Sequence, residues 1–194
     1  TDHHGAGGEW RVEYPRVRWD ILDAVREAAA QMGVPATDDF NTGDNEGAGY
    51  FHVNQKRGLR WSAARGFLEP VARRPNLRIE TGCLVDRLVM ANGRATGVAY
   101  LRNGSPQLAM AKGEVILCAG AIGSVQILHR SGIGPSQWLA AAGVVAVIDR
   151  KGVGRNLQDH LQQRAVFRVT GSRTLNETYH SLIGRIGMGL DYVA

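Results

Sequence analysis

The stretch that decides the fold reads Glu114-Val-Ile-Leu-Cys-Ala-Gly-Ala-Ile-Gly-Ser-Val-Gln-Ile-Leu-His-Arg-Ser-Gly-Ile-Gly134. Its first apolar run, Val115 to Ala119, predicts a short buried strand. A Gly-Ala-Ile-Gly-Ser turn follows, and an apolar helix is expected from Ser124 to Arg130, ending before Gly132. A strand that enters a helix through a glycine-rich turn is where α/β folds bring backbone close to a ligand. The stretch therefore predicts a ligand-facing turn.

The residues before this stretch have the pattern of a β-meander. Strands are predicted over residues 77–81, 84–90, 95–101 and 107–111. Asn92-Gly93 and Asn103-Gly104 separate the last three of these runs. Asn-Gly between apolar runs is a strong hairpin signal, because both residues accept a positive φ. The meander is expected to lead directly into the buried strand.

The outer parts of the chain predict shorter elements. Apolar residues at helical spacing predict a helix from about Trp19 to Met32, and Ser62 is a good N-cap for a helix over residues 63–68. A further helix is expected over residues 135–142, and another within 171–194 after a loop. Strands are predicted over residues 50–55, 144–148 and 165–169, and residues 37–49 predict a long loop.

Composition indicates a globular protein without a nucleic-acid surface. The 194 residues are 44% hydrophobic and 21% charged, which is ordinary for a folded domain. The net charge of +5 comes almost entirely from arginines that are scattered along the chain. No basic helix with interleaved aromatic residues is present, so we expect a solvated basic surface and no nucleic-acid partner.

Cysteine usage and hydropathy point to a reducing compartment. Cys83 and Cys118 have apolar neighbours and are predicted to be two buried thiols, with a single disulfide as the open alternative. No apolar run approaches the roughly 18 residues of a membrane span. No signal peptide is visible, and we expect a cytoplasmic location. The sequence begins without a methionine, so we expect the natural N-terminus further upstream. No metal site is predicted.

Several motifs, in order along the chain, resemble the glucose–methanol–choline (GMC) oxidoreductases, a family of FAD enzymes that act on alcohols. Gly120-Ala-Ile-Gly-Ser-Val-Gln-Ile-Leu128 through Ser131-Gly-Ile-Gly134 resembles the family's second signature, with Val125 where proline or serine is usual. Gly152-Val-Gly-Arg-Asn-Leu-Gln-Asp-His160 is similar to the family's Gly-Val-Gly-x-Asn-Leu-x-Asp-His. Further matches are Gly58-Leu-Arg-Trp-Ser-Ala-Ala64, Arg74-Pro-Asn-Leu77 and Asp38-Asp-Phe-Asn41.

The resemblance implies which residues contact the cofactor. A valine in the family's Thr-Gly-x-x-Val pattern holds the FAD adenine through backbone contacts, and the match here is Val85 in Thr81-Gly-Cys-Leu-Val85. Ala119 and Gly120 resemble the strand end that lies close to the FAD. A core role for Val85 and a packing role for Gly120 are the open alternatives. Asp159, Asn156 and Gln158 are expected to fix the turn after Gly152, and Asp159 and His160 are not expected to act as a catalytic dyad.

The resemblance also implies that this chain is the central segment of a longer enzyme. The family's Gly-x-Gly-x-x-Gly pyrophosphate turn and its catalytic histidine have no counterpart here, so no catalytic residue is assigned. The implied fold is an α/β (α+β mixture): the central part of a GMC-type FAD-binding fold, with a β-meander and part of the substrate domain. We expect residues 1–75 to belong to the substrate domain and a connecting segment, 76–160 to the FAD-binding domain, and 161–194 to the start of the substrate-domain sheet.

The implied reaction is hydride transfer from the CH–OH group of a primary alcohol or polyol to flavin. Choline-oxidising relatives often carry a glutamate two residues after the Asp-His pair, whereas this chain has Gln162, which favours an uncharged alcohol. The isolated chain is expected to be inactive, and to associate with itself or with the missing parts of the same protein. A non-catalytic binding domain derived from a GMC core is the alternative function.

Overall fold

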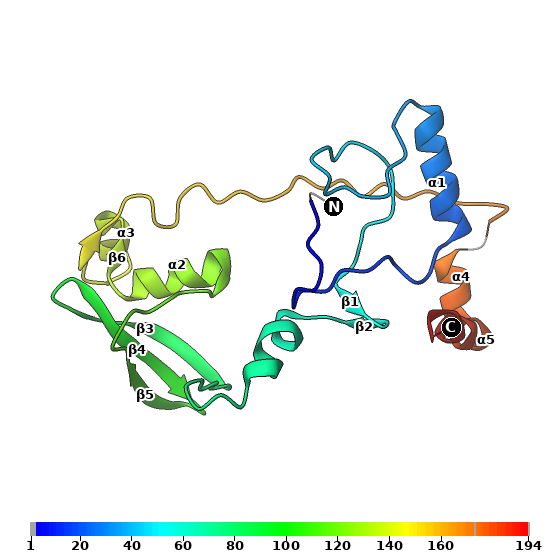
Figure 1. The fold of residues 1–194 in the computed structure, drawn as a ribbon. Helices are drawn as coiled ribbons and strands as arrows, with labels where there is room; N and C mark the ends of the chain where they lie inside the picture. The colour runs from blue at the N-terminus through cyan, green and yellow to red at the C-terminus, as the bar shows by residue number, and fades with distance from the viewer. Residues whose placement is uncertain (1–2, 173, 194) are drawn as a thin grey trace. The chain divides into compact units, whose positions relative to one another are not determined.

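The structure, a computed structural model, describes residues 3–172 and 174–193 and divides the chain into two compact units. Unit 1 comprises Thr1–Arg78 and Ala165–Ala194, and unit 2 comprises Ile79–Arg164. Strands and helices both occur along the chain, in agreement with the mixed fold class (Figure 1).

Unit 2 is built on an antiparallel sheet in the order β3-β4-β5. The strands are β3 (Cys83–Ala91), β4 (Arg94–Arg102) and β5 (Ser105–Met110). Both predicted Asn-Gly hairpins are confirmed: φ is +51° and +73° at Asn92 and Gly93, and +50° and +80° at Asn103 and Gly104. Positive φ at both central residues gives the turn the same twist as the strands, so the turns fix the register of the meander.

Helices and a small parallel sheet complete unit 2. Helix α2 (Gly120–Arg130) packs against β3 (Figure 1). It is followed by β6 (Ile133–Gly134), α3 (Ser136–Ala141) and β7 (Ile148–Asp149), and β6 pairs in parallel with β7. Both predicted helices are present, with Gly132 and Gly143 in the left-handed region at their ends, but α2 begins at Gly120, so the residues predicted as a turn before Ser124 form its first turn.

The buried apolar core lies in unit 2 and is small. Among the described residues, the buried hydrophobic side chains are Leu88 of β3, Ile127 of α2 and Leu139 of α3. Ser131, 7% exposed, joins two of these elements: its hydroxyl accepts a hydrogen bond from the Leu88 backbone N–H (2.8 Å) and donates one to the Ile127 carbonyl (2.5 Å). One serine therefore closes α2 and fixes it to the sheet.

Replacing this serine is expected to loosen α2 from the sheet. Ser131→Ala leaves the Leu88 N–H buried without an acceptor, which costs about 1–3 kcal/mol of unfolding free energy. Chemical denaturation measures the loss, and hydrogen exchange at the Leu88 amide should accelerate. Ser105→Ala, at an exposed position that begins β5, is the matched control. Equal stability of the two variants would contradict the bridging role.

Unit 1 contains several short elements. They are α1 (Asp20–Gln31), β1 (Gln55–Lys56), β2 (Leu59–Arg60), the π-helical turn η1 (Ala64–Leu68), the 3-10 turn η2 (Glu69–Val71), α4 (Leu175–His180) and α5 (Leu182–Val193). The predicted α1 and the C-terminal helical region are confirmed. Ser62 accepts a hydrogen bond from the Arg65 N–H (3.4 Å), but the residue at the N-cap of the π-helical turn is Ala63 and not Ser62 as predicted.

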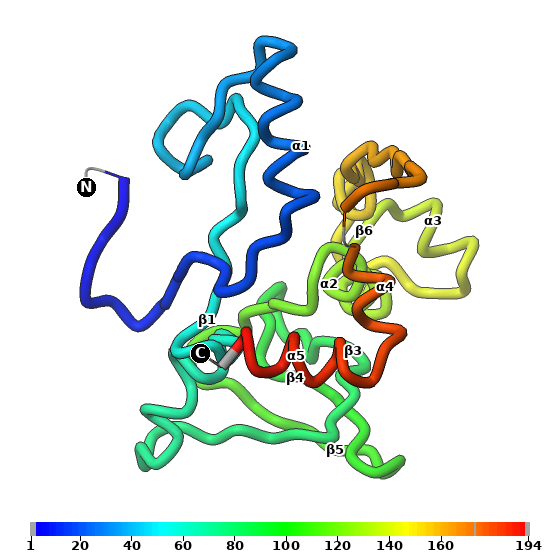
Figure 2. Tube along the Cα trace, turned by 90° about the vertical axis from the view of Figure 1, so that its right-hand side faces the viewer, coloured from blue at the N-terminus to red at the C-terminus, as the bar shows by residue number. Residues whose placement is uncertain are grey.

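A hydrogen-bonded clasp joins the C-terminal helix of unit 1 to the first hairpin. The Tyr192 hydroxyl lies 2.5 Å from the Gly58 carbonyl and 3.3 Å from Gln55 Oε1. The buried Gln55 side chain also donates to the Tyr14 carbonyl (2.9 Å). Figure 2 shows the end of α5 beside β1. Residues more than 130 positions apart in sequence thus form one unit.

Several predicted strands are wrong. No strand forms over residues 77–81, 115–119 or 165–169, and those predicted over 50–55 and 144–148 reduce to pairs of residues at 55–56 and 148–149. A strand requires a neighbouring strand to pair its backbone groups. These runs have strand-like composition, but the described chain places no long partner beside them.

Candidate functional site

An apolar groove of about 580 Å³ lies in unit 2, between the sheet and the residues that lead into α2. Val85 of β3 and Ala119, at the start of α2, both line it, so the structure brings together two of the three predicted cofactor residues. The other lining residues are Gly97, Val98, Ala109, Met110, Ala111, Glu114, Val115, Ile116, Leu117, Cys118 and Ile127. The contribution of β4 and β5 is not among the sequence predictions, although the apolar residues of these strands were a signal for it.

One wall of the groove is the segment Glu114–Cys118, for which the sequence predicts a buried strand. It is neither paired nor buried: no backbone hydrogen bond joins it to another described segment, and Ile116 is 73% exposed. Cys118 is exposed and Cys83 half-buried, so the prediction of two buried thiols is wrong. Both cysteines are free. An uninterrupted apolar run is typical of a strand covered on both faces, and this segment lacks such cover.

The turn from this segment into α2 presents backbone to open space. The Ser124 hydroxyl accepts a hydrogen bond from the Ala119 N–H (3.1 Å) and so closes the turn. Gly120 has φ +81°, and a Cβ built on it would meet no atom within 4 Å. The free amide groups at the start of an eleven-residue helix favour a negatively charged group nearby. The turn therefore leaves room for a negatively charged group close to its backbone.

Val85 lies at an irregularity of β3. The pairing of β3 with β4 shifts register between Val85 and Arg87, so Asp86 is the extra residue of a bulge. The Asp86 carboxylate forms ion pairs with Arg87 (2.6 Å) and with Arg130 in the last turn of α2. Because β3 is an edge strand of its sheet, its outer side is available for backbone contacts near Val85.

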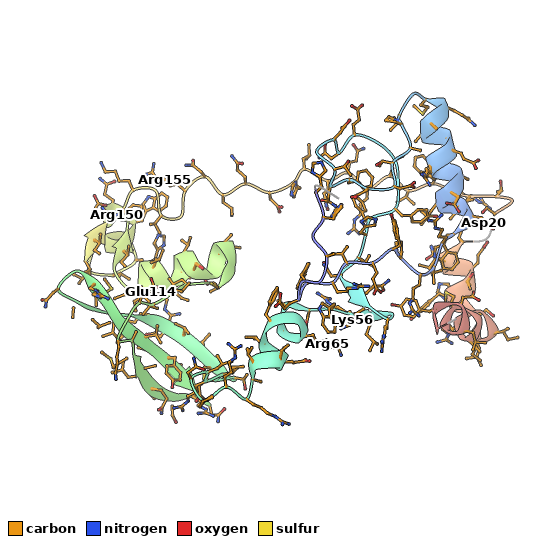
Figure 3. The ribbon with its side chains drawn as sticks, in the orientation of Figure 1. Asp20, Lys56, Arg65, Glu114, Arg150 and Arg155 are labelled. Atoms are coloured by element: carbon orange, nitrogen blue, oxygen red, sulfur yellow. The ribbon has the colours of Figure 1, made fainter. Side chains whose placement is uncertain are left out.

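The Gly152–His160 segment leaves the parallel sheet through a tight turn. Gly154 has φ +81° and Asn156 has φ +56°, and Arg150 and Arg155 lie on either side of the turn (Figure 3). Asp159 accepts the backbone N–H of its neighbour His160 (2.8 Å), and both side chains are exposed. Neither residue lines the groove, and the hydrogen bond between them is local to the turn.

An aspartate caps the short helix α3. The Ser136 backbone N–H, 3.1 Å from Asp149 Oδ1, lowers the pKa of the Asp149 carboxyl, and the Ser136 hydroxyl and nearby Lys151 act in the same direction. A depressed pKa in the folded state stabilises the fold above the unfolded pKa of about 3.9 and loses this contribution as pH falls through the folded value.

Removing the charge of the Asp149 carboxylate is expected to make the stability of the fold depend less on pH in the acid range. Asp149→Asn should lower Tm at pH 7, and the difference from the parent chain should shrink as pH drops below about 3.9. Thermal unfolding across a pH series measures this difference. Asp159→Asn, at an exposed carboxylate outside this cap, is the control; a difference for Asp149→Asn that stays constant with pH would contradict the cap.

Metal ligands and membrane-spanning helices are both missing from the part of the chain that the structure describes. No group of three or more histidine, cysteine, aspartate or glutamate side chains is arranged to hold a metal ion in residues 3–172 and 174–193. Over the same ranges, every helix is too short or too polar to cross a bilayer.

Comparison with known proteins places these features in a family. Residues 9–162 match the family model described as GMC oxidoreductase. The chain is 44% identical over 170 residues to an oxygen-dependent choline dehydrogenase of Burkholderia thailandensis, a match that covers 86% of this chain and 30% of the relative. An oxygen-dependent choline dehydrogenase of Stenotrophomonas maltophilia is 45% identical over 164 residues, with 84% and 29% coverage.

Comparison with solved structures gives the same result as comparison with related sequences. Pyridoxine 4-oxidase from Mesorbium loti matches with a TM-score of 0.73 and 36% identity, covering 81% of this chain and 31% of that one. A fungal aryl-alcohol oxidase matches with a TM-score of 0.73 and 30% identity, covering 79% and 26%. The chain thus spans about 30% of the length of the curated relatives it matches. On this agreement of pattern, identity and structure, the chain belongs to the GMC oxidoreductase family.

Proposed function

We propose that this chain is a segment of an FAD-dependent oxidoreductase that oxidises the CH–OH group of a primary alcohol or polyol. The observation that carries the proposal is the groove lined by Val85 and Ala119, next to the open turn at Gly120, in a chain 44% identical to choline dehydrogenases. Bound flavin supplies the hydride acceptor for such a reaction. The proposed role of this chain is to bind and orient that cofactor.

Three residues are proposed to contact FAD. The backbone of Val85 holds the adenine, and Ala119 and Gly120 allow the cofactor to approach the start of α2. The apolar lining of the groove suits a planar ring, while the helix N-terminus suits a phosphate-bearing group. The proton-accepting base is proposed to come from another part of the full-length protein.

A glycine substitution tests this site directly. Gly120 and Gly143 have similar positive φ values (+81° and +70°), and a Cβ added at either would meet open space, so alanine should strain the backbone equally at both. In the full-length protein, Gly120→Ala is expected to reduce the flavin content, measured by absorbance, while Gly143→Ala retains it. Equal flavin content in the two variants would remove Gly120 from the site.

Activity assays test the enzyme class. The full-length protein is expected to oxidise primary alcohols or polyols, and the isolated 194-residue chain to be inactive. Choline and an uncharged primary alcohol, assayed side by side, test whether Gln162 favours the uncharged substrate. Stoichiometric FAD and alcohol oxidation by the isolated chain would overturn the segment interpretation. A stable, monodisperse chain without flavin would instead favour the alternative of a non-catalytic binding domain.

The cellular location and the partners of this protein are also proposals. We propose a cytoplasmic protein with a small alcohol as substrate and no nucleic-acid partner. Exposed apolar residues such as Ile116 and Val145 favour association of the isolated chain with itself or with the rest of the same protein. Light scattering of the isolated chain tests the association.

A further inference from the structure

We infer that His129 is a positioning residue that holds the Gly152–Gly154 turn against the end of α2. His129 lies in the last turn of α2, and its half-buried ring stands between two loops that follow the helix in sequence. The importance of this contact for catalysis rests on the proposed function. Helix α2 begins at the proposed cofactor residues, and the turn leads into the Asn156–His160 motif.

Two motif glycines enclose the imidazole ring. A Cβ built on Gly134 would lie 2.6 Å from His129 Cδ2 and 2.9 Å from Nε2. A Cβ built on Gly154 would lie 3.1 Å from Cε1 and 3.3 Å from Nε2. These distances are shorter than ordinary van der Waals contact. A side chain at Gly134 would clash with the ring, and one at Gly154 would press closely against it, so the ring lies near both positions.

One hydrogen bond of the ring depends on its tautomer. His129 Nε2 lies 3.4 Å from the Val153 carbonyl oxygen. A carbonyl only accepts hydrogen bonds, so this hydrogen bond requires the tautomer that carries its proton on Nε2. The backbone hydrogen bonds of the turn itself are local: Val153 N–H to the Arg150 carbonyl, and Arg155 N–H to the Gly152 carbonyl. His129 thus adds the long-range polar contact that ties the turn to α2.

The arrangement connects two motifs that are separate in sequence. Gly134 ends the Ser131–Gly134 motif, which follows α2 directly, whereas Gly154 belongs to the segment after β7. The same side chain contacts both, and its helix starts at Gly120. A shift of the ring would move the Asn156–His160 segment relative to the helix that carries the proposed cofactor residues.

Paired substitutions in the full-length protein test the contact. Gly134 and Gly152 both lack a positive φ, but only Gly134 faces the ring, and open space surrounds Gly152. Gly134→Ala is expected to lower Tm and Gly152→Ala to leave it nearly unchanged. Combined with His129→Ala, the Gly134→Ala penalty should shrink, with a coupling of roughly twofold to a hundredfold in the unfolding equilibrium constant. Additive effects would overturn the enclosure.

Two variants of His129 separate the effect of its hydrogen bond from the effect of its packing. His129→Gln keeps an N–H donor and His129→Leu removes it while filling the space. Hydrogen exchange of the Gly152–Arg155 amides should stay near the parent rate in the Gln variant and rise at least severalfold in the Leu variant. Nitrogen-15 NMR of the parent at alkaline pH should show the Nε2–H tautomer. Equal exchange in both variants, or an Nδ1–H tautomer, would overturn the inference.

Measuring the flavin content of the full-length protein distinguishes failure of this inference from failure of the proposed function. A full-length protein without FAD contradicts the proposed function, yet leaves the tautomer and coupling results to decide the role of His129. A protein that binds FAD but shows no coupling between Gly134 and His129 contradicts the inference alone.

Discussion

Gly132→Ala is expected to destabilise unit 2 by about 3 kcal/mol, from a left-handed backbone penalty of roughly 1–2 kcal/mol and an overpacking penalty of similar size. Gly132 has φ +77°, and a Cβ there would lie 2.5 Å from the Val145 carbonyl oxygen and 2.7 Å from Val147 Cγ2. The obstacle is backbone that is fixed in place: the Gly132 carbonyl accepts hydrogen bonds from the Val147 and Ile148 N–H groups. The β6–β7 pairing would have to separate to admit the methyl group.

Gly143→Ala is the matched control for this substitution. Gly143 also has a positive φ (+70°) and also ends a helix, but nothing lies within 4 Å of a Cβ there. It should lose only the conformational part, about 1–2 kcal/mol. Equilibrium denaturation gives the two losses, and hydrogen exchange should show faster opening at Ile148 in Gly132→Ala alone. If both variants lose the same free energy, the close approach at Gly132 does not constrain the fold.

Local signals make the meander and the helices predictable. Asn92-Gly93 and Asn103-Gly104 define their own turns, since the preference for positive φ belongs to the two residues themselves. Helix α2 is predictable in the same way, from its apolar residues and from Gly132 at its end. Features that depend only on a few consecutive residues are therefore recovered from the sequence.

Features that depend on distant neighbours are not predictable in this way. The Val115–Ala119 run has the composition of a covered strand, but burial and pairing depend on a partner strand that composition cannot supply. The exposed Cys118 has the same explanation, because apolar neighbours in sequence do not guarantee a buried environment. The length of an element is set by its partners as much as by its own residues.

The candidate site is predictable only through the family resemblance. Val85 and Ala119 come from different motifs, and the residues alone give no reason to place them in one groove. His129 is absent from the sequence predictions. The available signal was the pair of motif glycines at Gly134 and Gly154, since glycine often marks a close approach, but the sequence does not say which side chain approaches.

The second large effect is expected at Leu139, the most deeply buried apolar side chain among the described residues, which is 2% exposed. Leu139→Ala should cost about 2–5 kcal/mol, because it removes buried methyl groups and leaves a cavity in a core with few other apolar members. Leu139 Cδ2 lies 3.6 Å from the position of a Gly134 Cβ, so this side chain fills the space between α3 and β6. Its loss should therefore loosen α3 and the β6–β7 pair together.

Two further variants separate the effect of burial at Leu139 from the effect of replacing a leucine as such. Leu157→Ala removes the same atoms at a site that is 69% exposed, and should change stability by less than about 0.5 kcal/mol. Leu139→Met nearly conserves volume and should cost less than about 1.5 kcal/mol. Denaturation of the three variants, with hydrogen exchange at the Val144 amide that donates to the Leu139 carbonyl (2.8 Å), provides the measurement. A Leu139→Ala loss no larger than that of Leu157→Ala would show that unit 2 is held together by its hydrogen bonds rather than by this core, because the cavity would then carry no penalty.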